Sequence, residues 1–463
     1  MTLLKTLPVS MFELLALALP WGLSFVDHYP YQEQAAEEGW ISDDGATWGV
    51  VCYSPEANTY SSLVVRRRID LVWTVIYGEG GFTLFEDAKA QITSRLEEGR
   101  ALEPLPPSTP RRQHLFAGAS EDAGSLFRLL RRKSKAQTAW VLGHLYLSMP
   151  KPDQNFVTDF RSSNFHTRLW ELLLLASFRE QGCFVSQDHP SPDFHIRRRS
   201  GDGAWIEAVT ANPPDADRYD HVDSPLAPIP NDPRDRCMGG AAVRFHKTLR
   251  SKIDRRYDQY SHVQGQPFAI ALADFHAPGS MMWSREALIT YLYGEYAEVQ
   301  NLDGVQAAVS VAVQTLSDDE GTPAGLFRSG ENDGLSAIIF SNGCTIAKFG
   351  RVMQTMSGLD YGYTRTRVGM IFDRTPGVLE GIPFCLDVSS REYQELWPQH
   401  YEPWSAELEV FHNPFAAYPF PRNVLPEAQH WFERDGSIVC EAFYETSVLW
   451  SETHVTNKRK AGG

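Results

Sequence analysis

The spacing of apolar and polar positions changes several times along the chain. In the first part of the chain, short runs typical of β-strands dominate. Runs of β-branched and aromatic residues between polar turns predict strands, and a longer periodic segment after them predicts a helix. These elements are strands at 47–53, 61–66 and 69–76 and a helix at 84–96. A Pro-rich linker near 101–113 and a helix at 125–135 with a basic end complete an N-terminal α+β domain, which we place at residues 1–155.

The next stretch alternates helical and strand-like segments, which is typical of an α/β domain. A strongly apolar helix at 168–181 ends at Gly182, and a basic helix at 241–260 follows a long loop at 211–239. Another helix is predicted at 285–297, and strands are predicted at 183–187, 192–198, 204–210, 267–275, 307–313, 337–340 and 368–372. We therefore place an α/β core at 156–375, followed by an acidic, Pro- and aromatic-rich extension at 376–463.

Composition narrows the class of protein. A hydrophobic content of 43%, a charged content of 22% and 12 Trp describe a packed globular chain and exclude disordered and coiled-coil classes. The formal net charge of −15 argues against a protein that coats nucleic acid or membrane, but it leaves room for a local basic groove. Six scattered cysteines without a CxxC pair fit reduced thiols in a cytosol.

The N-terminal segment 11–26 is apolar but is interrupted by Glu13 and Pro20, so we expect an amphipathic or buried helix rather than a signal peptide. No uninterrupted apolar run of about 20 residues occurs in the chain, which predicts a cytoplasmic protein without a membrane span. The sequence carries no signal that defines an oligomeric state.

Candidate chemistry begins with Glu171, which lies in the almost wholly apolar segment RLWELLLLASF. A buried carboxylate is costly unless it is bound to a metal or paired with a cation. The structural alternative is an ion pair with Arg168, three residues earlier on the same helix.

Two further carboxylates flank a turn. If strands 192–198 and 204–210 form a hairpin centred near Gly201, Asp193 lies opposite Val209, and His195 lies opposite Glu207. Because side chains alternate along strands, Asp193 and Glu207 then share one face with their Cβ atoms about 7–8 Å apart. Two carboxylates at that separation suit a divalent metal with oxygen ligands.

These residues resemble the pattern of the PD-(D/E)XK nuclease superfamily, in which a helix Glu precedes Pro-Asp on one strand and (Asp/Glu)-x-Lys on the next. Here Glu171, Pro192-Asp193 and Glu207 match in order and spacing, over about residues 158–276. The resemblance implies a restriction-endonuclease-like fold, with a mixed central sheet flanked by helices. It also implies Mg²⁺ or Mn²⁺ held by Asp193, Glu207, the Ala208 carbonyl and Glu171, and hydrolysis of a DNA phosphodiester bond by a metal-activated water.

One position departs from the family pattern, because Val209 stands where the family has Lys. In some branches the following helix supplies that Lys, and the basic segment 243–256 offers Lys252 first and Lys247 second. A solvated basic face is the alternative for either lysine. Basic residues in this helix and at the hairpin tip are the candidate nucleic-acid contacts, with His195 as an accessory residue: Arg197, Arg199, Lys247, Arg255 and Arg256.

The sequence thus predicts a metal-dependent nuclease that acts on DNA rather than RNA, and the fold type suggests bacterial or mobile-element genome defence as its setting. The alternative, for which Val209 is the main argument, is a nuclease fold that has lost catalysis and binds nucleic acid or protein. A third hypothesis is a metallohydrolase that uses the two tripeptides Asp193-Phe-His195 and Asp274-Phe-His276. The GxSxG, HExxH, P-loop and GxGxxG motifs are absent, which argues against serine hydrolases, zincins, NTPases and dinucleotide enzymes.

Overall fold

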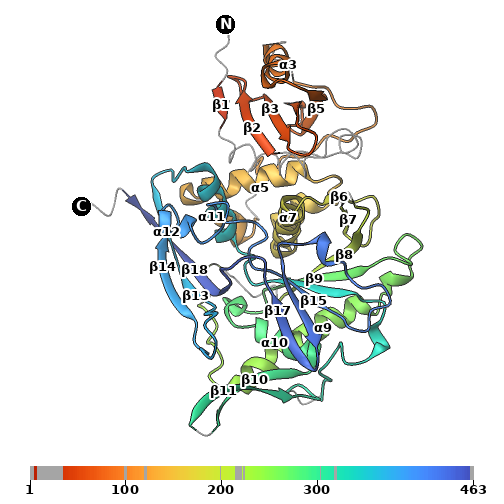
Figure 1. Cartoon of the computed structure of the whole chain (residues 1–463), viewed down its shortest axis with the longest axis vertical. Helices are drawn as coiled ribbons and strands as arrows, with labels where there is room; N and C mark the ends of the chain where they lie inside the picture. Colours follow the sequence, from red (N-terminus) through yellow and green to blue (C-terminus); the bar gives the residue numbers. More distant parts are fainter. Residues whose placement is uncertain are drawn as a thin grey trace.

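The computed structural model describes residues 5–7, 35–97, 102–118, 123–198, 200–213, 222, 225–302, 304–317 and 321–458. A small N-terminal sheet with one helix lies at one end of a larger α/β body (Figure 1). The helix expected at 11–26 falls outside the described residues. None of the helices within them combines the length and the apolar character that crossing a membrane requires.

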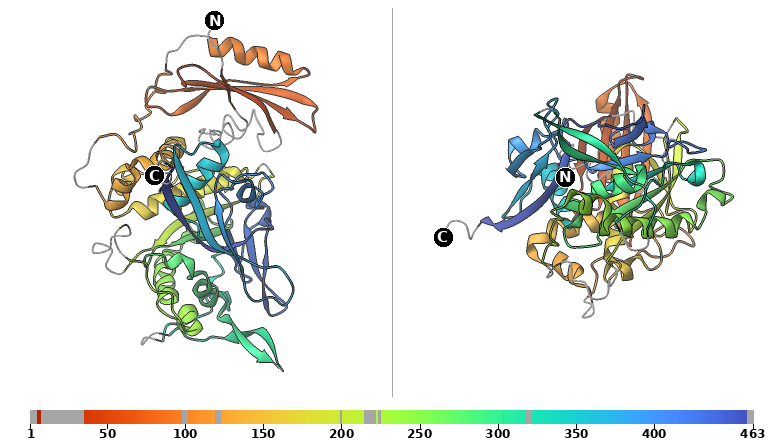
Figure 2. Two further views of the ribbon diagram at one scale, coloured as in Figure 1. Left: turned by 90° about the vertical axis from the view of Figure 1, so that its left-hand side faces the viewer. Right: turned by 90° about the horizontal axis from the view of Figure 1, so that it is seen from below.

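The N-terminal sheet has five antiparallel strands in sequence order. Its elements are β1 (Lys5–Leu7), β2 (Ala35–Ile41), β3 (Thr47–Ser54), β4 (Thr59–Arg67), β5 (Trp73–Phe82) and α3 (Phe85–Glu97). The apolar side of α3, which includes Ala88 and Ile92, packs on Val51 and Val64 of the sheet. Figure 2 shows α3 on the outer face, so the opposite face of the sheet looks toward the body. The predicted strands and the helix after them are confirmed.

The chain enters the body earlier than expected. Phe127 of α4 (Ser125–Leu130) and Leu142 of α5 (Ala136–Ser148) belong to the same hydrophobic core as the body helix α7 (Phe165–Glu180). The N-terminal domain therefore ends before α4 rather than at residue 155, because these apolar side chains pack on the body. The helix predicted at 125–135 is divided into α4 and the 3₁₀ turn η2 (Lys133–Lys135).

The body is organised around an eight-stranded mixed sheet, as the sequence predicted for the central layer. Its strand order is β17-β16-β15-β12-β9-β8-β7-β6, and β8, β9 and β12 run parallel at its centre. The strands are β6 (Phe184–Ser186), β7 (Phe194–Arg197), β8 (Gly203–Ala211), β9 (Phe268–Asp274), β12 (Ala337–Ser341), β15 (Leu408–His412), β16 (Gln429–Arg434) and β17 (Ser437–Glu441).

Helices cover both faces of this sheet (Figure 1). Successive side chains of β9 point to opposite faces and are buried on both, so each face needs a helical layer. Ala271 and its same-face neighbours pack against α5, α7 and α11 (Ile346–Ser357), and the indole N–H of Trp170 donates to the Ala271 carbonyl at 2.9 Å. Ile270 and Leu272 point the other way, toward α9 (Gly240–Ile253) and α10 (Arg285–Tyr293). The nearly continuous apolar strand thus lies between two helical layers, as buried parallel strands do.

The remaining elements lie around this core. They are α6 (Phe156–Phe160), α8 (Pro233–Met238), η4 (Tyr257–Gln259), η5 (Ser280–Met282), β10 (Glu295–Leu302), β11 (Val305–Ala312), η6 (Gly330–Asn332), β13 (Tyr363–Ile371), β14 (Ile382–Asp387), α12 (Arg391–Gln394), η7 (Arg422–Val424) and β18 (Val448–Asn457). The helix predicted at 285–297 ends at Tyr293, because Gly294 adopts a left-handed φ of 68° and the chain continues into β10. The loop predicted at 211–239 contains α8, which Asp232 caps through the N–H of Arg234.

The predicted boundary at 375 does not separate an extension from the core. Strands β15, β16 and β17 all come from the segment 376–463, yet they continue the central sheet beyond β12. Strand β18 returns to pair with β13 in a three-stranded sheet with β14. The segment 376–463 is therefore part of the body, because its strands find their hydrogen-bond partners there.

A buried histidine pair joins two of these late strands. The Nε2 of His412 lies 2.8 Å from the Nδ1 of His430, whose Nε2 lies 2.9 Å from the carbonyl of Leu425. Because a carbonyl only accepts, His430 carries its proton on Nε2, and His412 donates to Nδ1. Burial lowers the pKa of both rings, and that of His412 falls to about 3.

We expect this pair to make the fold sensitive to mild acid. The unfolded chain takes up protons near pH 6.5 while buried His412 does not, so stability is lost as the pH falls below that value. Between pH 7.5 and 5 the loss attributable to His412 is about 2 kcal/mol. Urea unfolding at both pH values should show a smaller loss for His412→Gln, which keeps a donor but cannot be protonated. Exposed His454, replaced in the same way, is the control, and an equal loss in wild type and His412→Gln would contradict the expectation.

Candidate active site

The hairpin that carries two of the predicted carboxylates is formed, with a register two residues away from the expected one. His195 pairs with Trp205, so continuing the ladder by two residues places Asp193 opposite Glu207 rather than opposite Val209. The difference arises in the turn. Since Arg197 pairs with Gly203, Gly201 (φ 94°) lies near the end of the turn and not at its centre. A shift of two residues keeps every side chain on its face, so Asp193 and Glu207 still share one side of the sheet.

Glu207 is held by two donors on one oxygen. Its Oε1 accepts from the Nζ of Lys252 at 2.6 Å and from the hydroxyl of Tyr257 at 2.7 Å. The residue is 4% exposed, and its Oε2 has no hydrogen-bond partner among the described residues. One carboxylate oxygen is thus fixed while the other remains available in a buried position.

Lys252 reaches this carboxylate from the last turn of α9, the helix that the sequence identified as basic. Lys247, the second candidate, is exposed on the same helix. Val209, at the position where the nuclease pattern has a lysine, packs with the apolar residues between the sheet and α9. A lysine ammonium therefore lies beside Glu207 even though the strand itself does not supply one.

Asp193 lies directly before β7 and contacts β8 next to Glu207. Its Oδ2 accepts a hydrogen bond from the N–H of Ala208 at 2.7 Å, so the contact seen at Ala208 is made by its amide and not by its carbonyl. Burial, and next the charge of Glu207, raise the pKa of Asp193 to about 7, against the opposing effects of the Ala208 N–H and Lys252. The two carboxylates thus interact strongly enough to favour a proton or a cation between them.

Glu171 lies on α7 and forms an ion pair with Arg168, which was the alternative to metal binding. Its Oε1 accepts from Arg168 at 2.9 Å, and Arg168 also contacts Asp159 at 2.5 Å and Asp153 at 3.4 Å. Burial, and next the charge of Asp193, raise the pKa of Glu171 to about 8 despite the guanidinium. Glu171 is therefore electrostatically coupled to the site while Arg168 fixes its side chain.

The donor set fits a hard divalent cation bound by two carboxylates. Over the described ranges, no three His, Cys, Asp or Glu side chains converge as a group that could hold an ion. Asp193 and Glu207 nevertheless offer oxygens on one face, and the Oε2 of Glu207 lacks a partner within the described chain. Mg²⁺ keeps several waters and is commonly bound through one or two carboxylates together with substrate phosphates, so Asp193 and Glu207 are the residues that would hold it.

A cleft of about 1100 Å³ leads to this site. It lies between β5 with the linker after α3 on one side and the body on the other, and Glu171 and Asp193 are among its lining residues. Glu207, Lys252 and Tyr257 are not among the described residues that line it. The cleft therefore gives a substrate access to the carboxylates from the side of Asp193.

The other predicted site residues are not gathered here. His195 stacks on Trp205 with ring centroids 4.1 Å apart, and burial together with the charge of Arg197 lowers its pKa to about 4. Arg197 is exposed at the end of β7, and Arg199 falls outside the described residues. Neither His195 nor Arg197 lines the cleft.

The end of α9 separates two of the candidate nucleic-acid contacts, Arg255 and Arg256, from the helix. Because α9 stops at Ile253, Arg255 and Arg256 are exposed beyond it and do not follow helical spacing. Arg255 donates to the hydroxyl of Tyr257 at 3.2 Å, whereas Arg256 pairs with Asp258. The sequence missed Tyr257, because its place on Glu207 depends on the reversal of the chain after α9, for which the spacing gives no signal.

The pairs considered for a metallohydrolase also remain separate. The Nδ1 of His276 lies 2.7 Å from Asp274 of the same tripeptide, and Asp274 is 1% exposed. Within the described residues these groups do not form a metal-holding cluster with His195 and Asp193.

Comparisons of the chain with protein-family models, with curated proteins and with solved structures found no match.

Proposed function

We propose that this protein is a metal-dependent nuclease that hydrolyses DNA phosphodiester bonds at the site formed by Asp193, Glu207 and Lys252. The observation that carries the proposal is the 2.6 Å contact of Lys252 with Glu207, on the carboxylate that faces Asp193 across the hairpin. The hairpin supplies the two acidic groups, of which Asp193 lines the cleft, and α9 supplies the lysine that contacts Glu207.

Each residue has a separate part in this proposal. Asp193 and Glu207 would hold Mg²⁺ or Mn²⁺, which when bound supplies an acidified water and neutralises phosphate charge. Tyr257 and Lys252 fix one oxygen of Glu207, so the other oxygen is presented in a defined direction. The ammonium of Lys252 would also orient the attacking water and stabilise negative charge as the phosphate is attacked. Arg168 keeps Glu171 in place beside the centre.

The second candidate is a nuclease fold without catalysis that binds nucleic acid or protein. Two observations favour it, namely Val209 at the family's lysine position and the pairing of Glu171 with Arg168. In this case Lys252 would neutralise Glu207 permanently, and the site would need no cation.

Cleavage assays with purified protein separate the two functions. We expect wild-type protein to cut or nick plasmid and linear DNA with Mg²⁺ or Mn²⁺ and to lose this activity in EDTA. Asp193→Asn, which removes a charge at constant shape, should be inactive with either metal while it melts at a temperature similar to that of wild type. The same residual cleavage in wild type and Asp193→Asn would reject the enzyme and favour the binding module.

A further inference from the structure

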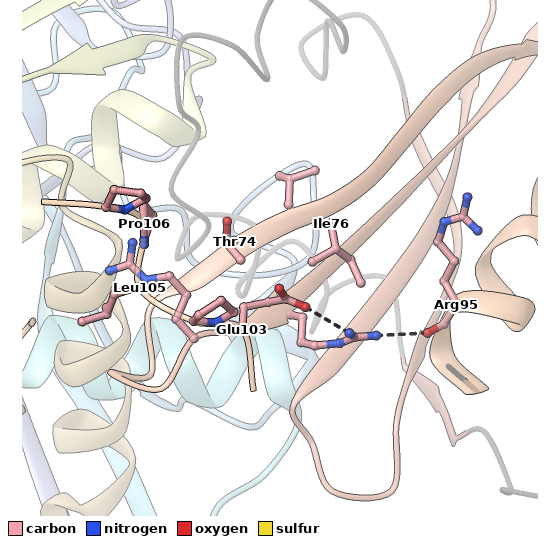
Figure 3. Close-up of a pocket in the computed structure, with 11 residues that line it drawn as sticks. Thr74, Ile76, Arg95, Glu103, Leu105 and Pro106 are labelled. Carbon is pink, nitrogen blue, oxygen red and sulfur yellow. Dashed lines mark hydrogen bonds and ion pairs between the residues drawn. The ribbon is translucent and has the colours of Figure 1, made fainter. Parts of the chain in front are cut away.

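The cleft at the candidate site continues into a groove along the N-terminal sheet. The groove, of about 520 Å³, lies between β5 and the linker and shares Arg68, Thr74 and Val75 with the cleft. Figure 3 shows it with Thr74 and Ile76 of the sheet on one side and Leu105 and Pro106 of the linker on the other. Together they form one path that leads from the N-terminal domain to Asp193.

The N-terminal sheet and the linker form the roof of this path, and side-chain hydrogen bonds hold this roof against the body. The N–H of Arg112 donates to Asp70, and its guanidinium donates to the carbonyls of Tyr146 and Met149 at 3.0 and 3.1 Å. In the groove itself, Arg66 bridges Glu103 at 3.0 Å and the carbonyl of Arg95 at 3.2 Å (Figure 3). The N-terminal sheet and the linker are thus held against the body by side chains that span both, so the path is a built feature of the fold.

The walls of the path carry a surplus of cations, in contrast to the acidic chain as a whole. Among the described residues that line the cleft, five are Arg or Lys and three are Asp or Glu. The groove adds two arginines, Arg66 and Arg95, and one glutamate, Glu103, while Arg68 lines both cavities. Arg111 and Lys151 are exposed on opposite sides of the cleft, on the linker and on the body. Such walls attract a chain of phosphates.

An exposed ring lies next to the carboxylates. His189 lines the cleft four residues before Asp193, and its imidazole stacks flat on His262 with centroids 3.8 Å apart and planes 2° apart. His262 is held in turn by the carbonyl of Ser191 at 2.9 Å. The His189 ring is thus supported on one face by His262 and exposed to the cleft, so it is suited to stack on a planar base.

We propose that this path binds a single strand of DNA, with phosphates on Arg111 and Lys151 and a base against His189. The inference rests on the proposed function and specifies the form of its substrate. The cleft volume of about 1100 Å³ is close to the upper end of small-ligand pockets, so it holds a few nucleotides of one strand and not a duplex under the roof. A base can stack on His189 only where it is free of its complement.

Binding without hydrolysis tests the phosphate contacts. In EDTA, fluorescence anisotropy with a labelled single-stranded oligonucleotide should show at least tenfold weaker binding for the double variant Arg111→Glu/Lys151→Glu. Because two phosphate contacts are lost, the plot of the logarithm of the association constant against the logarithm of the salt concentration should become shallower. Its negative slope should shrink in magnitude by about 1.4. The double variant Lys133→Glu/Arg391→Glu changes the net charge equally at exposed positions away from the path and should bind as wild type does. Equal losses in the two double variants would overturn the proposal.

The stacking contact and the strand preference are tested in the same assay. His189→Ala should bind the single strand about tenfold more weakly, and His189→Trp should restore the affinity. His454→Ala, at an exposed histidine elsewhere, is the control. A blunt duplex of the same sequence should bind at least tenfold more weakly than the single strand, and equal or tighter binding of the duplex would reject the proposal. Single-strand binding without cleavage would reject only the nuclease, and cleavage that prefers duplex would reject only this inference.

Discussion

Replacement of Lys252 by alanine is expected to lower the rate of Mg²⁺-dependent DNA cleavage by about 10²–10⁴-fold, the range that positioned proton-transfer groups contribute. Lys252 is a cation that contacts Glu207, and the chain has Val209 where the nuclease pattern has a lysine. The variant would lose both the orientation of the water and the charge next to the phosphate. Single-turnover cleavage at saturating protein measures this rate without a contribution from substrate binding.

Two companion variants show whether the loss belongs to Lys252 itself. Lys247→Ala removes a lysine from the same helix at an exposed position and should cleave within about threefold of wild type. Tyr257→Phe leaves Lys252 on Glu207 but removes the second donor, so we expect a smaller loss, on the order of tenfold. Since Lys252→Ala leaves a buried carboxylate without its cation, melting temperatures must accompany the rates. A variant that is folded and as active as wild type would exclude Lys252 from the reaction.

The sequence predicted the parts of this site that depend on local periodicity. Alternation along strands placed Asp193 and Glu207 on one face, and this result survives the register shift because the shift is even. The apolar helix around Glu171 and the basic helix that contains Lys252 were also recognised from their own composition. In each case a residue's neighbours in sequence determine which way its side chain points.

The rest of the site and the fold depends on contacts between distant segments. Tyr257 reaches Glu207 only because the chain reverses after Ile253, and Arg112 joins the N-terminal sheet to α5 across a linker. Likewise, β15 to β17 extend a sheet whose earlier strands end near residue 341. Local patterns do not specify such pairings, because strand order depends on which hydrophobic faces meet in three dimensions.

The attachment of the C-terminal segments also involves a buried ionic cluster that the sequence pattern did not reveal. Glu402, which is 0% exposed, accepts from the Nε and the Nη2 of Arg351 at 2.9 Å each and from the hydroxyl of Tyr393 at 2.6 Å. Lys348 of α11 lies 3.1 Å from the same carboxylate, and Arg367 of β13 lies 3.6 Å from it. These contacts connect α11, the three-stranded sheet and the segment before β15.

The cations determine the charge state of this cluster. Burial alone would raise the pKa of Glu402, but Arg351, Lys348 and Arg367 together hold it well below its usual range. The other carboxylate within reach is Glu407, which pairs with Arg367 and lies 3.6 Å from Lys348. Three buried cations therefore depend on two carboxylates, of which Glu402 makes the larger number of contacts.

Replacement of Glu402 by glutamine is accordingly expected to lower the free energy of unfolding by about 3–5 kcal/mol, the cost of leaving buried charges unpaired. The side chain keeps its size, so the loss would reflect charge and not a cavity. Urea unfolding followed by tryptophan fluorescence measures it, with Glu441→Gln as the control. Glu441 pairs with Arg434 and Arg422 at the surface, so its replacement should cost far less than that of Glu402. Because the cluster lies outside the lining of the cleft, the folded fraction of Glu402→Gln should bind single-stranded DNA as wild type does. A loss no larger than that of Glu441→Gln would mean that the cluster contributes little to joining α11 and the C-terminal strands.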